Sequence, residues 1–232
     1  MKFIKDHSTT TAILLFARSE STESTSKPIS CQKKQNQLLW EKMNEKVIKT
    51  IQKTNLPYFI SDETTQLGAT FGKKITHSIQ EIFAQGFDKV IVIGNDCLEL
   101  QSQHLLDASD KLQTNDFVLG ADSNGGAYLI GISKTVFEAN KFEAISWQTA
   151  NVSVELQTLF SKKNSAYLPF LNDCNSASDF KKAIHKLSFS NPLRSLILSL
   201  LQNKTVLNQF ETFLVSYEFS ALNFNKGSPF SF

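Results

Sequence analysis

The sequence predicts an α/β fold, built as a three-layer α/β/α sandwich around a mostly parallel sheet. Short aliphatic runs such as residues 89–93 (Lys-Val-Ile-Val-Ile) alternate with longer segments whose apolar residues recur at helical spacing. A short apolar run bounded by glycine and polar residues is typical of a strand buried on both faces of a sheet. Strands that alternate with helices indicate parallel strands joined by right-handed crossovers. A length of 232 residues suits one such domain, or one domain with an appendage.

The first part of the chain contains two predicted strands and two predicted helices. Residues 12–17 and 56–60 are short apolar runs and are predicted to be strands. Residues 32–53 and 71–86 place apolar side chains three or four positions apart, which predicts amphipathic helices. Residues 19–26 consist only of Ser, Glu and Thr, and this composition predicts a loop.

Further elements are predicted up to residue 187. In chain order they are a strand at 89–93, a helix at 102–112, two strands near 118 and at 127–130 joined by the Gly125-Gly126 turn, a helix at 149–161, a strand at 167–171, and a helix after the loop 173–178. Pro169 interrupts one of these runs and therefore predicts an edge strand. Ser178 is expected to cap the last helix.

The chain is predicted to divide into two units. Residues 1–187 form the main domain, and residues 188–232 form a helix-plus-strand extension that packs on it. Apolar residues recur at helical spacing over 193–201, which predicts the helix. Apolar residues at alternate positions over 213–219 predict the strand. The phenylalanines near the carboxy end are expected to cover a face of the same domain; the alternative is a subunit contact in a homo-oligomer.

Composition and charge exclude several classes of function. A formal net charge of +2 gives no electrostatic reason to expect a nucleic-acid partner. The cysteines, Cys31, Cys97 and Cys174, are odd in number and widely spaced, so reduced thiols are expected rather than disulfides or a zinc site. Residues 12–17 are too few to cross a bilayer and lack a signal-peptide cleavage context. No membrane span is expected, and the expected location is cytoplasmic.

Asp96 is the first candidate for a functional residue. It follows the run 89–93 almost directly and therefore stands at the carboxyl end of a predicted strand. In open α/β sheets ligands bind beyond these ends. The alternative is an aspartate that only caps the next helix or turns the chain. No Gly-x-Gly-x-x-Gly follows the first strand, which argues against a dinucleotide-dependent oxidoreductase.

Two motifs carry a resemblance to a known family. Residues 93–100 (Ile-Gly-Asn-Asp-Cys-Leu-Glu-Leu) and 118–131 (Val-Leu-Gly-Ala-Asp-Ser-Asn-Gly-Gly-Ala-Tyr-Leu-Ile-Gly) resemble the radical-SAM/selenodomain-associated transferases, a bacterial domain of unknown function (2064). Shorter matches begin at Gln66, Trp147 and Asp173. The resemblance implies the nucleotide-diphospho-sugar transferase (glycosyltransferase-A) type of fold, with a nucleotide-binding main domain. Trp147 is expected in the core or in a pocket wall.

By this resemblance the protein is a metal-dependent glycosyltransferase or nucleotidyltransferase. Its donor would be a nucleotide sugar or a nucleoside triphosphate, and its acceptor an unknown small molecule. Asp96 is the expected catalytic residue, and Mg²⁺ or Mn²⁺ would be held by Asp96 together with Asp122 or Asp173. The residues expected to bind the nucleotide are Ala17, Arg18, Gln66, Lys73, Asn95, Asn124 and Gly125. For Gln66 and Lys73 a solvated helix start is the alternative.

Other positions depart from the family pattern. After the first strand the family carries Lys-x-Pro-x-x-Gly-x-x-Lys-Thr-Arg, whereas this chain has the cations Arg18 and Lys27, no glycine, and the additional Glu20 and Glu23. Glycine backbone and cations suit a phosphate, whereas carboxylates repel it. Asn124 and Asn175 stand where the family has aspartates. The second hypothesis is therefore a family member that has lost turnover and acts as a binding or interaction protein.

Overall fold

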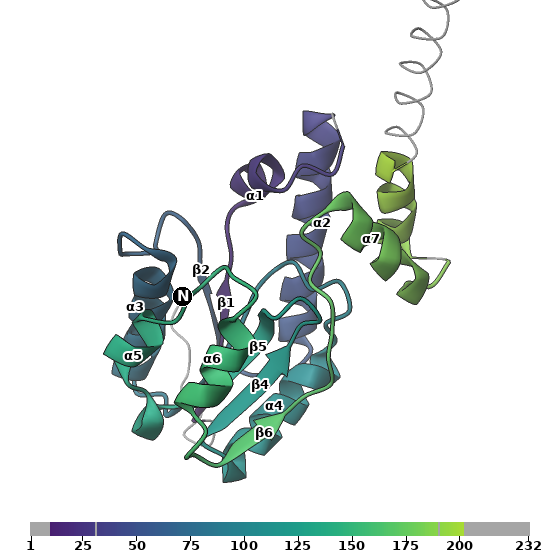
Figure 1. Cartoon of the computed structure of the whole chain (residues 1–232). Helices are drawn as coiled ribbons and strands as arrows, with labels where there is room; N and C mark the ends of the chain where they lie inside the picture. The colour runs from purple at the N-terminus through teal and green to yellow at the C-terminus, as the bar shows by residue number, and fades with distance from the viewer. Residues whose placement is uncertain (1–9, 31, 190, 202–232) are drawn as a thin grey trace, which may run out of the picture.

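The computed structural model describes residues 10–30, 32–189 and 191–201. Within these ranges six strands form one sheet in the order β2-β1-β3-β5-β4-β6 (Figure 1). The strands are β1 (Thr11–Phe16), β2 (Tyr58–Ser61), β3 (Lys89–Ile93), β4 (Phe117–Ala121), β5 (Ala127–Ser133) and β6 (Ser165–Tyr167). The pairs β1–β2, β1–β3 and β4–β6 are parallel, and β5 is antiparallel to both β3 and β4. The predicted mostly parallel sheet is confirmed, with β5 reversed because the turn before it is too short for a crossover.

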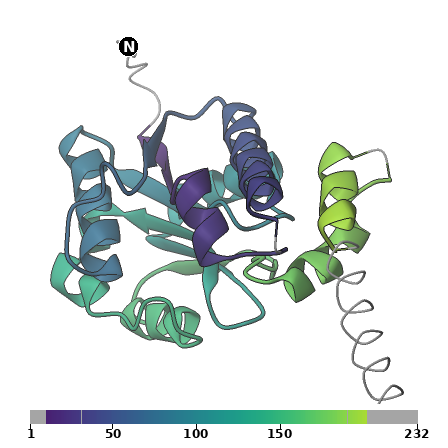
Figure 2. The same cartoon turned by 90° about the horizontal axis from the view of Figure 1, so that it is seen from above.

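Helices cover both faces of the sheet, which gives the predicted three layers (Figure 2). Their bounds are α1 (Glu20–Ser26), α2 (Lys33–Gln52), α3 (Phe71–Ala84), α4 (Ser102–Thr114), α5 (Ala139–Glu143), α6 (Val152–Leu159) and α7 (Ala177–Ala183), with short 3-10 turns at Lys134–Val136 and Ile184–Lys186. Residues 192–201 are also helical. No helix in the described part of the chain combines the length and apolar character needed to cross a bilayer.

Alternation along the central strand separates two apolar cores. Val90 and Val92 of β3 pack on one face with side chains of α3, α5 and α6. Ile91 and Ile93 pack on the other face with side chains of α2 and α4. Successive side chains of a strand point to opposite faces, so a strand covered on both sides has to be apolar throughout. This requirement explains why β3 could be located from sequence.

A third apolar cluster joins the carboxy-terminal segments to α2. Trp40 of α2 and Phe180 of α7 lie edge to face with ring centroids 5.9 Å apart. Leu193, Ile197 and Leu200 of the helix 192–201 are buried in the same cluster, and this helix lies beside α2 in Figure 1. The division into residues 1–187 and 188–232 stays a prediction. The strand predicted at 213–219, the terminal phenylalanines and Cys31 lie outside the described residues.

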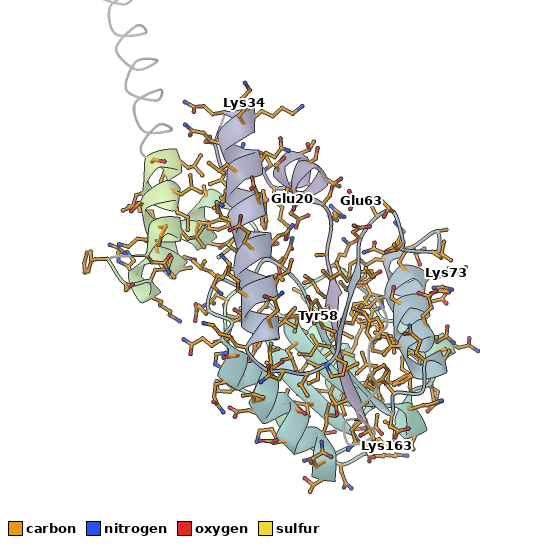
Figure 3. All side chains as sticks on the ribbon, turned by 180° about the vertical axis from the view of Figure 1, so that it is seen from behind. Glu20, Lys34, Tyr58, Glu63, Lys73 and Lys163 are labelled. Carbon is orange, nitrogen blue, oxygen red and sulfur yellow. The ribbon has the colours of Figure 1, made fainter. Side chains whose placement is uncertain are left out.

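The segment 19–26 is a helix, not the predicted loop. Ser19 caps α1, its side chain accepting a hydrogen bond from the backbone N–H of Thr22. Figure 3 shows Glu63 near α1. The Glu63 carboxylate accepts hydrogen bonds from the Ser19 backbone N–H (2.7 Å), the Ser19 hydroxyl and the Thr22 hydroxyl (2.6 Å). A helix this short is marginal alone. The prediction was wrong because polar contacts from a distant loop stabilise this helix.

Smaller corrections concern element ends in the second half of the chain. The predicted strand 167–171 is observed as β6, two residues earlier, at the edge of the sheet as expected. Pro169 follows β6 instead of interrupting it. The cap of α7 is Ser176, not Ser178, because its side chain accepts from the backbone N–H of Asp179.

The contacts of Glu63 predict a pH dependence of α1. Burial opposes ionisation, but the hydrogen bonds from Ser19 and Thr22 outweigh it and lower the pKa of Glu63 to about 2. A lowered folded-state pKa gives stability that is present above the unfolded value of 4.5 and is lost as pH falls toward 2. Because Glu63 is largely exposed, solvent screens these contacts. We expect them to contribute about 1 kcal/mol to the stability of α1. Backbone amide shifts of Ser19 and Thr22, followed by NMR from pH 6 to pH 2, should show a step in the wild type that is missing in Glu63→Gln.

Candidate functional site

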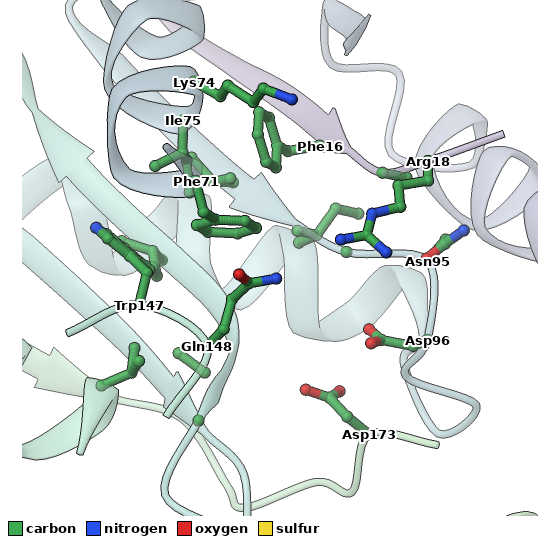
Figure 4. A pocket seen from close by; sticks show the side chains of 18 of the residues that line it. Phe16, Arg18, Phe71, Lys74, Ile75, Asn95, Asp96, Trp147, Gln148 and Asp173 are labelled. Carbon is green, nitrogen blue, oxygen red and sulfur yellow. The ribbon is translucent and has the colours of Figure 1, made fainter. Parts of the chain in front are cut away.

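A cavity of about 530 Å³ lies at the carboxyl ends of β1 and β3. This size falls within the range of small-molecule sites, and the position is where ligands bind in open α/β sheets. Its wall comes from the end of β1, the loop after β3, the start of α3, the loop between β4 and β5, and the segments around residues 148 and 173 (Figure 4). The cavity is therefore assembled from segments far apart in the sequence.

Most of the residues expected at a site line this cavity. They are Ala17, Arg18, Gln66, Asn95, Asp96, Asp122, Asn124 and Asp173. Lys73 and Gly125 do not line it, although their neighbours Lys74 and Gly126 do. The Lys73 amine instead lies 3.8 Å from the Glu143 carboxylate. Trp147 is part of the wall, which is one of the two places expected for it.

Several amide side chains of the wall hold the loops together. Gln66 donates from its amide to the backbone carbonyls of Ala17 (3.1 Å) and Ser61 (3.0 Å), which ties the ends of β1 and β2 to the loop before α3. The buried Asn95 donates to Asn44 of α2 (2.8 Å). Both side chains thus shape the site, because they fix the segments that carry its charged groups.

Three carboxylates gather at one end of the cavity. Asp122 is 6 % exposed and Asp173 is 8 % exposed. One oxygen of Asp122 accepts from the backbone N–H groups of Asn124 (2.7 Å) and Gly126 (2.8 Å). Asp96 is brought to the same end because the backbone N–H of Cys174 donates to the Asp96 carbonyl (2.9 Å). In contrast, Oδ1 of Asp173 is buried without a hydrogen-bond partner.

The surroundings of Asp173 favour its protonated form. Burial raises the pKa of this carboxyl to about 9, and the negative charges of Asp96 and Asp122 add to the effect. A hydrogen bond with Asp122 acts in the same direction. These surroundings hold the group in its protonated form, with the proton in the hydrogen bond to Asp122 and Oδ1 left as a buried acceptor without a partner.

An ion pair lies beside these carboxylates. Nζ of Lys27 is 2.7 Å from Oδ2 of Asp96 and 2.9 Å from Oε1 of Glu23. Burial lowers the pKa of Lys27, but the charges of Asp96 and Glu23 outweigh burial, so the pKa is raised overall. The sequence missed this arrangement, since α1 was predicted as a loop; the four-residue spacing of Glu23 and Lys27 was the available signal.

The resemblance implies Mg²⁺ or Mn²⁺ at Asp96, Asp122 and Asp173. Such ions require several oxygen ligands in a set geometry. Here Oδ2 of Asp96 is bound by an ammonium group, and Oδ1 of Asp122 is bound by two backbone N–H groups. No group of three His, Cys, Asp or Glu side chains within the described ranges is placed to hold a metal ion. The side chains in this arrangement do not fit a divalent cation, and the predicted metal role stays a prediction.

The opposite end of the cavity is aromatic. The rings of Phe71 and Trp147 have centroids 5.5 Å apart, and those of Phe71 and Phe16 are 5.3 Å apart. Trp147 is fixed by a hydrogen bond from its indole N–H to the Phe142 carbonyl (3.0 Å). The next residue, Gln148, has a φ of 65° and points its side chain into the cavity (Figure 4).

Arg18 lies between the two ends. Figure 4 shows its guanidinium between the aromatic rings and Asp96. Its Nη1 donates to the Ser26 hydroxyl of α1 (2.9 Å), which holds the group in place. The cavity thus offers a flat apolar surface at one end, the Arg18 guanidinium in the middle, and carboxylates with the Lys27 ammonium at the other. This order suits an elongated ligand with a planar ring and an anionic centre.

Comparison with protein families agrees with the two motifs. Residues 23–149, more than half of the chain, match the family described as "Uncharacterized protein conserved in bacteria (DUF2064)". The chain belongs to this family. The resemblance seen in the sequence is thereby confirmed, although Asp173 of this DUF2064 chain lies beyond the matched residues. A comparison with curated proteins gives no significant match.

Solved structures show that the DUF2064 chain shares a known fold. A protein from Desulfovibrio desulfuricans G20, provisionally named a nucleotide-diphospho-sugar transferase, is 19 % identical with a TM-score of 0.72; 84 % of this chain and 98 % of that chain are covered. A Mycobacterium sp. strain JC1 homologue of Rv0371c is 9 % identical with a TM-score of 0.44, covering 81 % and 97 %. A cytidylyltransferase from Leptospira borgpetersenii is 14 % identical with a TM-score of 0.43, covering 85 % and 96 %. The first similarity confirms the nucleotide-diphospho-sugar transferase type of fold.

Proposed function

We propose that this chain is a transferase whose donor is an activated nucleotide, either a nucleotide sugar or a nucleoside triphosphate. The observation that carries the proposal is the order of groups along one cavity at the carboxyl ends of β1 and β3. Aromatic rings, then the Arg18 guanidinium, then carboxylates with the Lys27 ammonium match the base, the phosphates and the transferred group of such a donor. The shared fold supports the same conclusion. The acceptor and the cytoplasmic location stay predictions.

Each end of the cavity has a distinct task in this proposal. The base packs against Phe71 and Trp147, which supply apolar surface at little entropic cost. Arg18 binds the phosphates through its planar guanidinium. The unpartnered Oδ1 of Asp173 accepts a hydrogen bond from the transferred group or from the acceptor, in a site where burial strengthens such a bond. Asp96, expected from the sequence to be catalytic, has a positioning role because it holds Lys27 at the wall.

Binding can be tested before the reaction is known. Thermal unfolding of the whole chain is measured with UDP, GDP, CDP, ADP, their triphosphates and common nucleotide sugars, each with and without Mn²⁺. A ligand at 100 times its Kd stabilises the folded state by about 2.7 kcal/mol, so the midpoint should rise by several degrees with at least one base.

Two variants test whether the ligand binds in the cavity. Asp96→Asn is expected to reduce the shift, because the weaker contact no longer holds Lys27 at the wall, and this loss outweighs the removal of one negative charge. Asp110→Asn, the same chemical change on the exposed face of α4, should leave the shift intact. With the responding nucleotide, release of nucleoside diphosphate or pyrophosphate then measures turnover. The proposal fails if no nucleotide shifts the midpoint of the folded protein.

One observation favours a second function, that of a binding protein without turnover. Glu23 is only 4 % exposed, and its carboxylate lies beside Lys27, so it adds negative charge where a phosphate would enter. Such a protein would keep the fold and the cavity but would not consume a donor. A nucleotide that binds in the thermal measurement and is never cleaved, with any acceptor tried, would favour this second function.

A further inference from the structure

We propose that the ammonium group of Lys27 takes the place of the divalent cation in this cavity, so that the donor's phosphates are bound by side chains alone. The inference rests on the proposed function, because it specifies how that site neutralises its donor. It starts from one contact: Nζ of Lys27 lies 2.7 Å from Oδ2 of Asp96, the residue that was expected from the resemblance to hold the metal.

Lys27 is held in place and does not swing freely. Its backbone carbonyl accepts from the indole N–H of Trp40 (3.4 Å), and its ammonium lies 5.4 Å from the centroid of the same ring. Lys27 follows α1 directly, and this helix is anchored at its other end by Glu63, through Ser19 and Thr22. The charge is therefore preorganised at the wall of the cavity, as a bound cation would be.

Lys27 and a metal ion compete for the same carboxylate. The side chains of Lys27 and Asp96 are each 21 % exposed, so the pair is largely shielded from solvent yet reachable from the cavity. A dication on Oδ2 of Asp96 would stand within a few ångströms of the ammonium group, and like charges at that distance repel strongly where water is scarce. Occupation of Asp96 by Lys27 therefore disfavours Mg²⁺ or Mn²⁺ there.

The Glu23 carboxylate contacts the Lys27 ammonium in the absence of a ligand. Its carboxylate lies 2.9 Å from the Lys27 ammonium and is almost fully buried. A diphosphate that binds Lys27 has to share the ammonium with this carboxylate or displace it. We expect Glu23→Gln to tighten nucleotide binding about fivefold, because the amide removes a like charge from the phosphate path.

The test compares metal dependence in the whole chain. Binding of UDP, GDP, CDP and ADP is measured by calorimetry in EDTA and in Mn²⁺, and binding of Mn²⁺ alone is measured by electron paramagnetic resonance. The wild type should bind its nucleoside diphosphate equally well in both buffers, within about twofold, and should bind Mn²⁺ alone weakly. Lys27→Met should weaken binding in EDTA at least tenfold, the loss expected for a charged hydrogen bond. It should also gain affinity for Mn²⁺, because Asp96 becomes available.

Two further variants keep the result interpretable. Lys27→Arg retains the charge and should keep metal-independent binding. This variant remains informative if Lys27→Met unfolds α1. Lys49→Met removes a lysine on the exposed side of α2 and should gain no affinity for Mn²⁺. Binding that the wild type shows only in Mn²⁺ overturns this inference and leaves the transferase proposal standing. Absence of binding in both buffers overturns the transferase proposal, and the inference falls with it.

Discussion

Asp173→Asn is expected to stabilise the ligand-free protein while it weakens ligand binding. The carboxyl is buried, one oxygen lacks a hydrogen-bond partner, and Asp96 and Asp122 surround it with negative charge. An amide of the same shape is neutral without taking up a proton on folding, and it can donate to Asp122. Relief of one buried, unfavourably placed carboxyl is worth about 2–3 kcal/mol at neutral pH. For a chain of this size the midpoint of thermal unfolding should rise by roughly 5–10 °C.

The gain from this substitution should depend on pH. The folded-state pKa of Asp173 is raised from 3.8 to about 9, so between these values the folded protein retains a proton that the unfolded chain releases. The wild type therefore loses stability as pH rises from about 4 to about 9, and Asp173→Asn does not. Unfolding midpoints at pH 5, 7 and 9 measure the difference, with Asp110→Asn as the control. A gain that is the same at pH 5 and pH 9 would contradict this account of the site.

Gly125→Ala is expected to destabilise the protein by about 3 kcal/mol or more. Gly125 has a φ of 87°, and a Cβ there would lie 2.0 Å from the carbonyl oxygen of Ala150. Backbone strain and a backbone clash therefore act together, and a flexible side chain cannot relieve either of them. Since residues next to Ala150 line the cavity, nucleotide binding should weaken as well. Denaturant unfolding and calorimetry measure the two effects.

Gly86→Ala is the matched control for this prediction. Gly86 has nearly the same left-handed φ, 92°, and lies at an exposed position after α3. Its substitution should cost about 1 kcal/mol, the strain of a left-handed residue alone. Equal losses in the two variants would show that the approach of Gly125 to Ala150 has no energetic weight.

The fold could be predicted where burial controls the sequence. The run Lys89–Ile93 had the bounds of the observed strand because both faces of β3 are covered, so no polar residue interrupts it. The composition of residues 19–26 predicted a loop where the structure has a helix. The groups that stabilise α1 are far away in the chain, and Glu63 is the clearest example. The direction of β5 follows from its short turn, since a connection of a few residues can join only antiparallel strands.

The site was predictable to the extent that it follows from strand ends. Asp96 could be placed at the cavity because ligands bind at the carboxyl ends of such strands. The choice between Lys73 and Lys74 could not be made, since one residue turns a helix by about 100° and so decides which side chain meets the cavity. The Lys27–Asp96 pair joins positions 69 apart in the sequence, and no local pattern reports such a contact.

The backbone pairing of Cys97 with Asp173 also makes the acidic end of the cavity depend on contacts between distant parts of the chain. Asp96 and Asp122 follow β3 and β4, whereas Asp173 comes from a segment beyond β6. Contacts between residues far apart in sequence carry the larger loop-closure cost during folding. We therefore expect the acidic end to be assembled after the local pair of β4 and β5 has formed.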